Sequence, residues 1–172
     1  GVPPGVINFV PGPGAEITEV ALSNPDFAGV HFTGSTAVFQ GLWQRIAEAL
    51  PNLKGYPRIV GETGGKDFVF AHSSADPEAL IANLIRGSYE YQGQKCSAAS
   101  RAYLPKSFWD RHRDDLCSQV NDIKYGDPTD FRNFMGAVID PASYATITKA
   151  IDQSRRDQDA DVVCGGQYDD AE

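Results

Sequence analysis

Ala28-Gly29-Val30-His31-Phe32-Thr33-Gly34-Ser35-Thr36 is the stretch that decides the fold. Its first five residues are typical of a short strand, which the Thr-Gly-Ser-Thr sequence interrupts. The segment that follows repeats apolar residues at helical spacing, at Val38, Leu42, Ile46 and Ala49. A strand, a glycine turn and a helix in this order predict an α/β unit with a parallel sheet, because parallel strands need a crossover connection.

Similar patterns continue in both directions along the chain. Toward the N-terminus they predict a strand at 6–10 and a helix at 15–22. Toward the C-terminus they predict strands beginning near residues 58, 67, 99 and 162, and helices at 77–91, 107–123 and 141–154. Asp76-Pro77 and Asp140-Pro141 each combine an N-cap residue with a proline at the first helical position. The predicted fold class is therefore α/β with parallel sheets.

Charge and hydropathy exclude several kinds of partner. The formal net charge is -8, and the isoelectric point is about 4.8. A nucleic acid or an anionic membrane surface would be repelled over most of such a surface. The longest apolar stretches, such as 6–10, are too short to span a bilayer. We therefore expect neither nucleic acid nor membrane as a main partner.

Cys96 is the one cysteine in a context that suits chemistry. It lies in the polar loop Gln92–Arg101, beside Lys95, between a predicted helix and a predicted strand. A neighbouring cation and a loop at a helix end favour the thiolate, which is the reactive form of cysteine. The alternative is an ordinary, partly buried thiol. Cys117 and Cys164 fall in helical and apolar patterns, and the wide spacing of the three cysteines indicates no metal site.

Two glycine-containing turns allow a ligand site or a purely structural role. Gly34-Ser35 leads into a helix, so its backbone could approach a phosphate, or Ser35 could serve only as an N-cap. Glu62 ends a strand just before Gly64-Gly65. The carboxyl ends of parallel strands are where ligand sites form, but Glu62 could equally be a solvated residue beside a tight turn.

Three of these stretches occur together, and in the same order, in one family. Phe32–Ser35, Glu62–Lys66 and Gly93–Cys96 resemble the cofactor turn, the general-base motif and the nucleophile motif of the NAD(P)-dependent aldehyde dehydrogenases. Residues 4–12 are similar to the strand that precedes the cofactor turn in that family. One departure is Phe39, which stands where many relatives have a second glycine, and it leaves the fine geometry of the cofactor turn open.

The resemblance implies a role for each matching residue. Cys96 would be the nucleophile, Glu62 the general base and Ser97 a substrate contact, whereas Gly34, Ser35 and Gly64 would lie at the cofactor, NAD. It implies that residues 1–62 form the C-terminal part of an NAD-binding domain and residues 63–172 the N-terminal part of a catalytic domain. We expect an internal fragment that is inactive alone.

Within the family, the chain is most similar to the branch that oxidises L-glutamate 5-semialdehyde to glutamate in proline catabolism. By this resemblance the full-length protein would be a homo-oligomer, in the mitochondrial matrix if the source is a eukaryote and in the cytoplasm otherwise. Two alternatives remain open: an aldehyde dehydrogenase for a different aldehyde, and a nucleotide-binding homologue whose thiol performs no chemistry.

Overall fold

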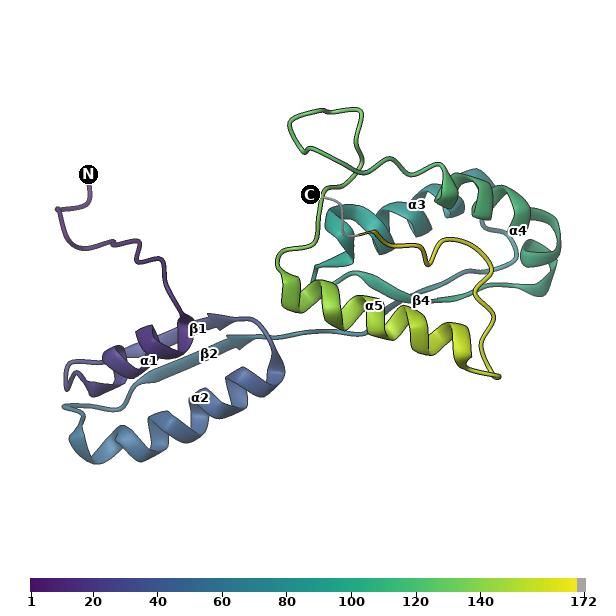
Figure 1. Ribbon diagram of the computed structural model, residues 1–172. Coiled ribbons are helices and arrows are strands. Elements are labelled where there is room, and N and C mark those ends of the chain that lie inside the picture. The colour runs from purple at the N-terminus through teal and green to yellow at the C-terminus, as the bar shows by residue number, and fades with distance from the viewer. Residues whose placement is uncertain (170–172) are drawn as a thin grey trace. The chain divides into compact units, whose positions relative to one another are not determined.

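The computed structural model describes residues 1–169, which divide into two compact units (Figure 1). The first unit comprises residues 1–64, and the second begins at Gly65. The division falls two residues after the boundary expected from the sequence. The assignment of the units as a cofactor segment and a catalytic segment stays a prediction.

The first unit is built around a parallel strand pair. Its elements are α1 (Gly14–Ser23), β1 (Gly29–Thr33), α2 (Thr36–Ala49), a 3-10 turn (Leu50–Asn52) and β2 (Arg58–Glu62). Strand β1 pairs with β2 in a register that runs from Gly29 opposite Arg58 to Thr33 opposite Glu62. Helix α2 is the crossover between them, as the sequence predicts. It begins where the Ser35 hydroxyl accepts a hydrogen bond from the Val38 N–H at 3.3 Å.

Phe39 fills the space between α2 and the two strands. Its ring stacks on Phe32 of β1, with centroids 5.8 Å apart and planes 9° apart. Phe32 is paired across the sheet with Gly61, which lies directly beneath the Phe39 ring. A Cβ atom added at Gly61 would lie 2.2 Å from Phe39 Cζ. The bulk at position 39 is thus accommodated by a glycine on β2.

The second unit repeats the parallel arrangement. Its elements are β3 (Asp67–Phe70), α3 (Pro77–Tyr89), a 3-10 turn (Glu90–Gly93), β4 (Ala99–Tyr103), α4 (Lys106–Asn121) and α5 (Pro141–Arg156). Strand β3 is parallel to β4, with α3 as the crossover. Asp76 and Asp140 cap α3 and α5 by accepting backbone N–H bonds of 2.8 and 2.7 Å. Ile81 of α3, 1% exposed, is the centre of a core that includes Ala71, Leu80, Leu84 and Phe108.

Two of the predicted strands are wrong. Residues 6–10 form a bend and irregular structure, with Ile7 79% and Phe9 92% exposed, and residues 162–164 are also irregular. An apolar, β-branched run becomes a strand only when a neighbouring backbone satisfies its N–H and C=O groups. Neither run has such a partner within residues 1–169. Helix α3 also ends two residues earlier than predicted, because the backbone leaves helical geometry at Glu90, whose ψ is 135°.

Substituting Gly61 by alanine should destabilise the first unit by about 1–3 kcal/mol, because the new methyl group would overlap the stacked Phe39 ring. The chain's two tryptophans, Trp43 and Trp109, lie in different units. Urea unfolding followed by Trp43 fluorescence in a Trp109→Phe background measures the change.

A double variant tests the cause. In Phe39→Ala/Gly61→Ala, the loss should be smaller than the sum of the two single losses, by a coupling of about 0.5–3 kcal/mol. Gly41→Ala is the control, because it adds a methyl group within α2 where no atom lies within 4 Å, and it should stabilise the unit by about 0.5–1 kcal/mol. Additive losses at residues 39 and 61 would contradict the packing argument.

Candidate functional site

Gly34 and Ser35 stand at the carboxyl end of β1, at the start of α2. The Gly34 N–H donates to the Glu62 carbonyl oxygen at 3.1 Å, which holds the turn against the end of β2. A Cβ atom at Gly34 would lie 2.6 Å from Phe32 Cζ, so any other residue would require the Phe32 ring to shift. Ser35 is the N-cap of α2, as one of the two readings expected. A bare glycine backbone followed by the N–H groups of a helix start fits the pyrophosphate of a dinucleotide such as NAD.

Glu62 is the last residue of β2 and is exposed. Alternation along the strand puts its side chain on the face opposite Gly61, and therefore away from the Phe39 ring. Its neighbour across the sheet is Thr33, directly before the glycine turn. The next glycine, Gly64, is exposed and has no atom within 4 Å of its Cβ position. Glu62 and the Gly34 turn are thus at one edge of the first sheet.

Cys96 and Ser97 are both exposed in the loop that enters the amino end of β4. The residue that lies against this loop is Gly65, two positions before β3. A Cβ atom at Gly65 would be 2.5 Å from the Cys96 carbonyl oxygen. The register of β3 and β4 also shifts between Asp67 and Phe68, as at a bulge. Such irregularities are common next to active sites because they redirect the backbone.

The positive charge of Lys95 is held in an ion pair. Its Nζ lies 2.9 Å from a carboxylate oxygen of Glu90, and Arg86 binds the other oxygen at 2.8 Å. The Lys95 hydrogen bond and both positive charges lower the pKa of Glu90. Sequence reasoning considered Lys95 only as a cation beside Cys96 and did not identify Glu90 as its partner.

Cys117, Cys164 and His112 each contact another side chain of the second unit. Cys117 lies on α4, and the Cys164 thiol is close to it. Burial, followed by the hydrogen bond with Cys117, raises the pKa of the Cys164 thiol to about 11. His112 packs on Phe108, with ring centroids 5.1 Å apart.

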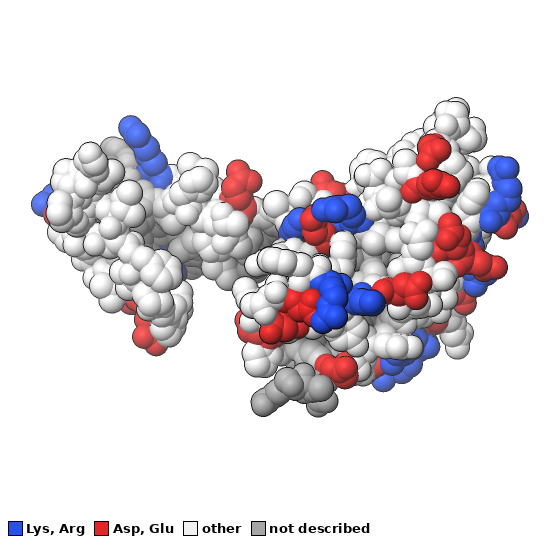
Figure 2. Space-filling model, turned by 90° about the horizontal axis from the view of Figure 1, so that it is seen from above, with Lys and Arg blue, Asp and Glu red and all other residues white. Residues whose placement is uncertain are grey.

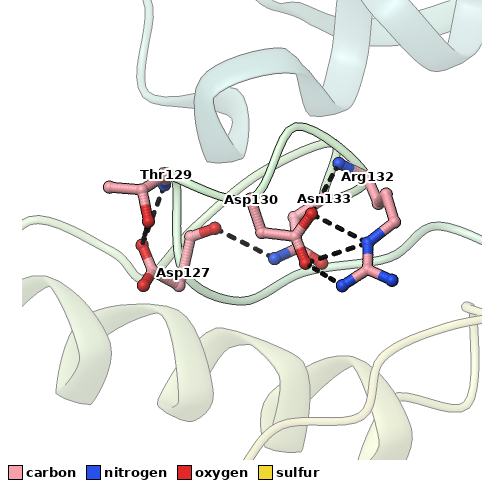
Figure 3. A network of polar contacts seen from close by, with 5 residues as sticks. All are labelled: Asp127, Thr129, Asp130, Arg132 and Asn133. Atoms are coloured by element: carbon pink, nitrogen blue, oxygen red, sulfur yellow. Dashed lines mark hydrogen bonds and ion pairs between the residues drawn. The ribbon is translucent and has the colours of Figure 1, made fainter.

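An acidic loop near residue 130 is satisfied by its own hydrogen bonds (Figure 3). Asp127 Oδ1 accepts from the N–H and the hydroxyl of Thr129, both at 2.8 Å, and the Asp127 carbonyl accepts from Asn133 at 3.0 Å. Asp130 binds Arg132 at 2.6 Å. These contacts lower the pKa of both aspartates. Across residues 1–169, no three His, Cys, Asp or Glu side chains are grouped as metal ligands.

Charges on the second unit are of mixed sign. In the view of Figure 2, acidic and basic groups alternate over its visible face. None of the helices described is long and apolar enough to cross a membrane.

The chain is similar to known proteins along its whole length. The family model described as "Aldehyde dehydrogenase family" matches residues 1–172. A probable delta-1-pyrroline-5-carboxylate dehydrogenase of Schizosaccharomyces pombe is 48% identical over 176 residues, which cover 100% of this chain and 32% of that protein. The mitochondrial delta-1-pyrroline-5-carboxylate dehydrogenase of Dictyostelium discoideum is also 48% identical, over 98% of this chain and 31% of that protein.

A solved structure agrees closely with this chain. The Delta-pyrroline-5-carboxylate dehydrogenase of Mycobacterium tuberculosis, in a crystal structure bound with NAD, is 49% identical and superposes with a TM-score of 0.94. The match covers 99% of this chain and 32% of that one. The chain thus spans about a third of the length of the relatives it matches.

Substituting Gly65 by alanine should displace the Cys96 loop, because the Cys96 carbonyl is backbone and cannot move aside alone. We expect the second unit to lose about 1–3 kcal/mol of stability and the amides of residues 94–98 to exchange faster. Urea unfolding followed by Trp109 fluorescence, in a Trp43→Phe background, and hydrogen exchange by mass spectrometry measure these effects.

Gly87→Ala is the matched control in the same unit. The added methyl group meets only Ala99 Cβ, at 3.7 Å, and a helical glycine replaced by alanine gains about 0.5–1 kcal/mol. If Gly65→Ala behaved like Gly87→Ala, the contact with Cys96 would not constrain the loop.

Proposed function

Because the chain belongs to the aldehyde dehydrogenase family, we propose that it carries the nucleophile and general base of an NAD-dependent enzyme that oxidises L-glutamate 5-semialdehyde to L-glutamate. The names of the relatives support this substrate, since 1-pyrroline-5-carboxylate is the cyclic form of that semialdehyde. The observation that carries the proposal is the exposed Cys96 thiol. Its loop lies against Gly65, which follows Glu62 by three residues in the sequence.

In the proposed reaction, the Cys96 thiolate attacks the aldehyde carbon, and the carbonyl π electrons move to oxygen. The Cys96 backbone N–H would donate to that oxyanion, and Ser97 would contact the substrate. NAD, when bound, accepts the hydride that leaves the same carbon as the C=O bond re-forms. The product of this step is a thioester on Cys96.

Glu62 would activate the water that hydrolyses the thioester. Its carboxylate takes one proton as the hydroxyl oxygen bonds to the acyl carbon, and the C–S bond breaks to return the thiolate and release a carboxylic acid.

The remaining assignments follow the same proposal. Residues 1–62 would contribute to the NAD-binding domain, with Gly34, Ser35 and Gly64 at the cofactor, and residues 63–172 to the catalytic domain. The full-length protein would be a homo-oligomer. The Dictyostelium and human relatives are named mitochondrial, so a eukaryotic source would indicate the mitochondrial matrix, and another source the cytoplasm.

Two substitutions separate the two roles in the protein expressed from its complete reading frame. Cys96→Ser should abolish NADH formation from glutamate semialdehyde and leave NAD affinity unchanged. Glu62→Gln should retain a single-turnover burst of NADH but lower steady-state turnover by about 10²–10⁴-fold, because only hydrolysis needs the base. Stopped-flow absorbance at 340 nm measures both. Substantial turnover by Cys96→Ser would exclude the mechanism.

Alkylation distinguishes an enzyme from a homologue without chemistry. In the same full-length protein, iodoacetamide at neutral pH should label Cys96 faster than Cys117 and Cys164, since Cys96 is exposed and the raised pKa of Cys164 leaves it almost entirely protonated. Peptide mass spectrometry over a time course gives the three rates. Equal rates would argue for the homologue.

A further inference from the structure

Two glutamines connect the Cys96 loop to a segment 45 residues further along the chain. Gln92 Nε2 donates to the Ala137 carbonyl at 2.8 Å, and Gln94 Oε1 accepts from the Ile139 N–H at 3.0 Å. One glutamine therefore uses the donor end of its amide and the other uses the acceptor end. Both side chains reach the same short stretch, residues 137–139.

The backbone between α3 and Cys96 needs such support. Tyr91 and Gln92 have φ angles of 55° and 57°, and Gly93 follows at 66°. Left-handed backbone is uncommon for residues with a Cβ, and it persists only where the surrounding structure fixes it. The Gln94 N–H donates to the Tyr91 carbonyl at 3.0 Å and closes this turn, while the Gln92 side chain fastens it to Ala137.

The partner segment is itself anchored. The Phe134 N–H donates to the Lys124 carbonyl at 2.8 Å, and the Gly126 N–H donates to the Met135 carbonyl at 3.1 Å. Gly136, which comes next, lies close enough to the Gln92 amide that an added Cβ atom would be 3.3 Å from Nε2. These two hydrogen bonds close the loop that immediately precedes residues 137–139. The segment is therefore fixed in place and can support the turn before Cys96.

We propose that Gln92 and Gln94 are positioning residues that fasten the Cys96 loop to residues 137–139 and so hold the thiol in place for attack. The proposal rests on the function proposed above for Cys96. Neither glutamine carries out a chemical step itself. Their effect is on the placement of the loop, where a displacement of about 1 Å can cost about 10²-fold in rate.

The opposite use of the two amides gives a matched test in the full-length protein. Gln92→Glu replaces the donor by a carboxylate, which cannot bind the Ala137 carbonyl, whereas Gln94→Glu retains an acceptor for the Ile139 N–H. The two variants carry the same charge change two residues apart. Gln94→Leu removes the acceptor without adding charge.

We expect Gln92→Glu and Gln94→Leu to lower kcat by about 10²-fold with NAD affinity unchanged, and Gln94→Glu to retain wild-type kcat. Amide exchange at Ile139 should be faster in Gln94→Leu than in Gln94→Glu. Unchanged kcat in Gln94→Leu, or equal losses in both residue 94 variants, would overturn the proposal.

A wild-type protein without turnover would instead refute the proposed function. In that case hydrogen exchange across residues 94–98 still decides the fastening. Faster exchange in Gln94→Leu than in Gln94→Glu supports it, and equal exchange overturns it.

Discussion

The close approach of Gly65 to the Cys96 carbonyl is the constraint on which the placement of the Cys96 loop in the second unit depends. It fixes the chain just before β3 against the loop just before β4, at the shared amino edge of two parallel strands. Because the Cys96 carbonyl belongs to the backbone, a side chain at position 65 would have to displace the loop itself. The missing side chain of Gly65 is therefore what allows the two segments of the second unit to lie this close together.

Much of the fold could be predicted because its signals are local. Three helices begin at signals that lie within one turn of the helix start. These signals are Gly34-Ser35, Asp76-Pro77 and Asp140-Pro141. The strands at 6–10 and from 162 were wrong for the opposite reason. Strand formation belongs to a pair of segments, and a single segment's pattern does not reveal whether its partner is present.

In the candidate site, too, local motifs could be predicted from the sequence and contacts between distant residues could not. The order of the motifs around Gly34, Glu62 and Cys96 was enough to select the family, and the family comparison confirms that choice. The roles of the three residues stay predictions. The sequence did not reveal the left-handed turn, since neither Tyr91 nor Gln92 is a residue that signals positive φ. The contacts of Gln92 and Gln94 were equally invisible, because no local rule relates residues 45 positions apart.

That separation also has a consequence during synthesis of the protein. Ribosomes add about 5–20 residues per second, so residues 137–139 emerge about 2–9 s after the glutamines that bind them. For that interval the nascent chain carries the Cys96 thiol on a turn whose supports do not yet exist. The order of translation therefore exposes the Cys96 thiol to oxidants and to non-native partners before its loop is fastened.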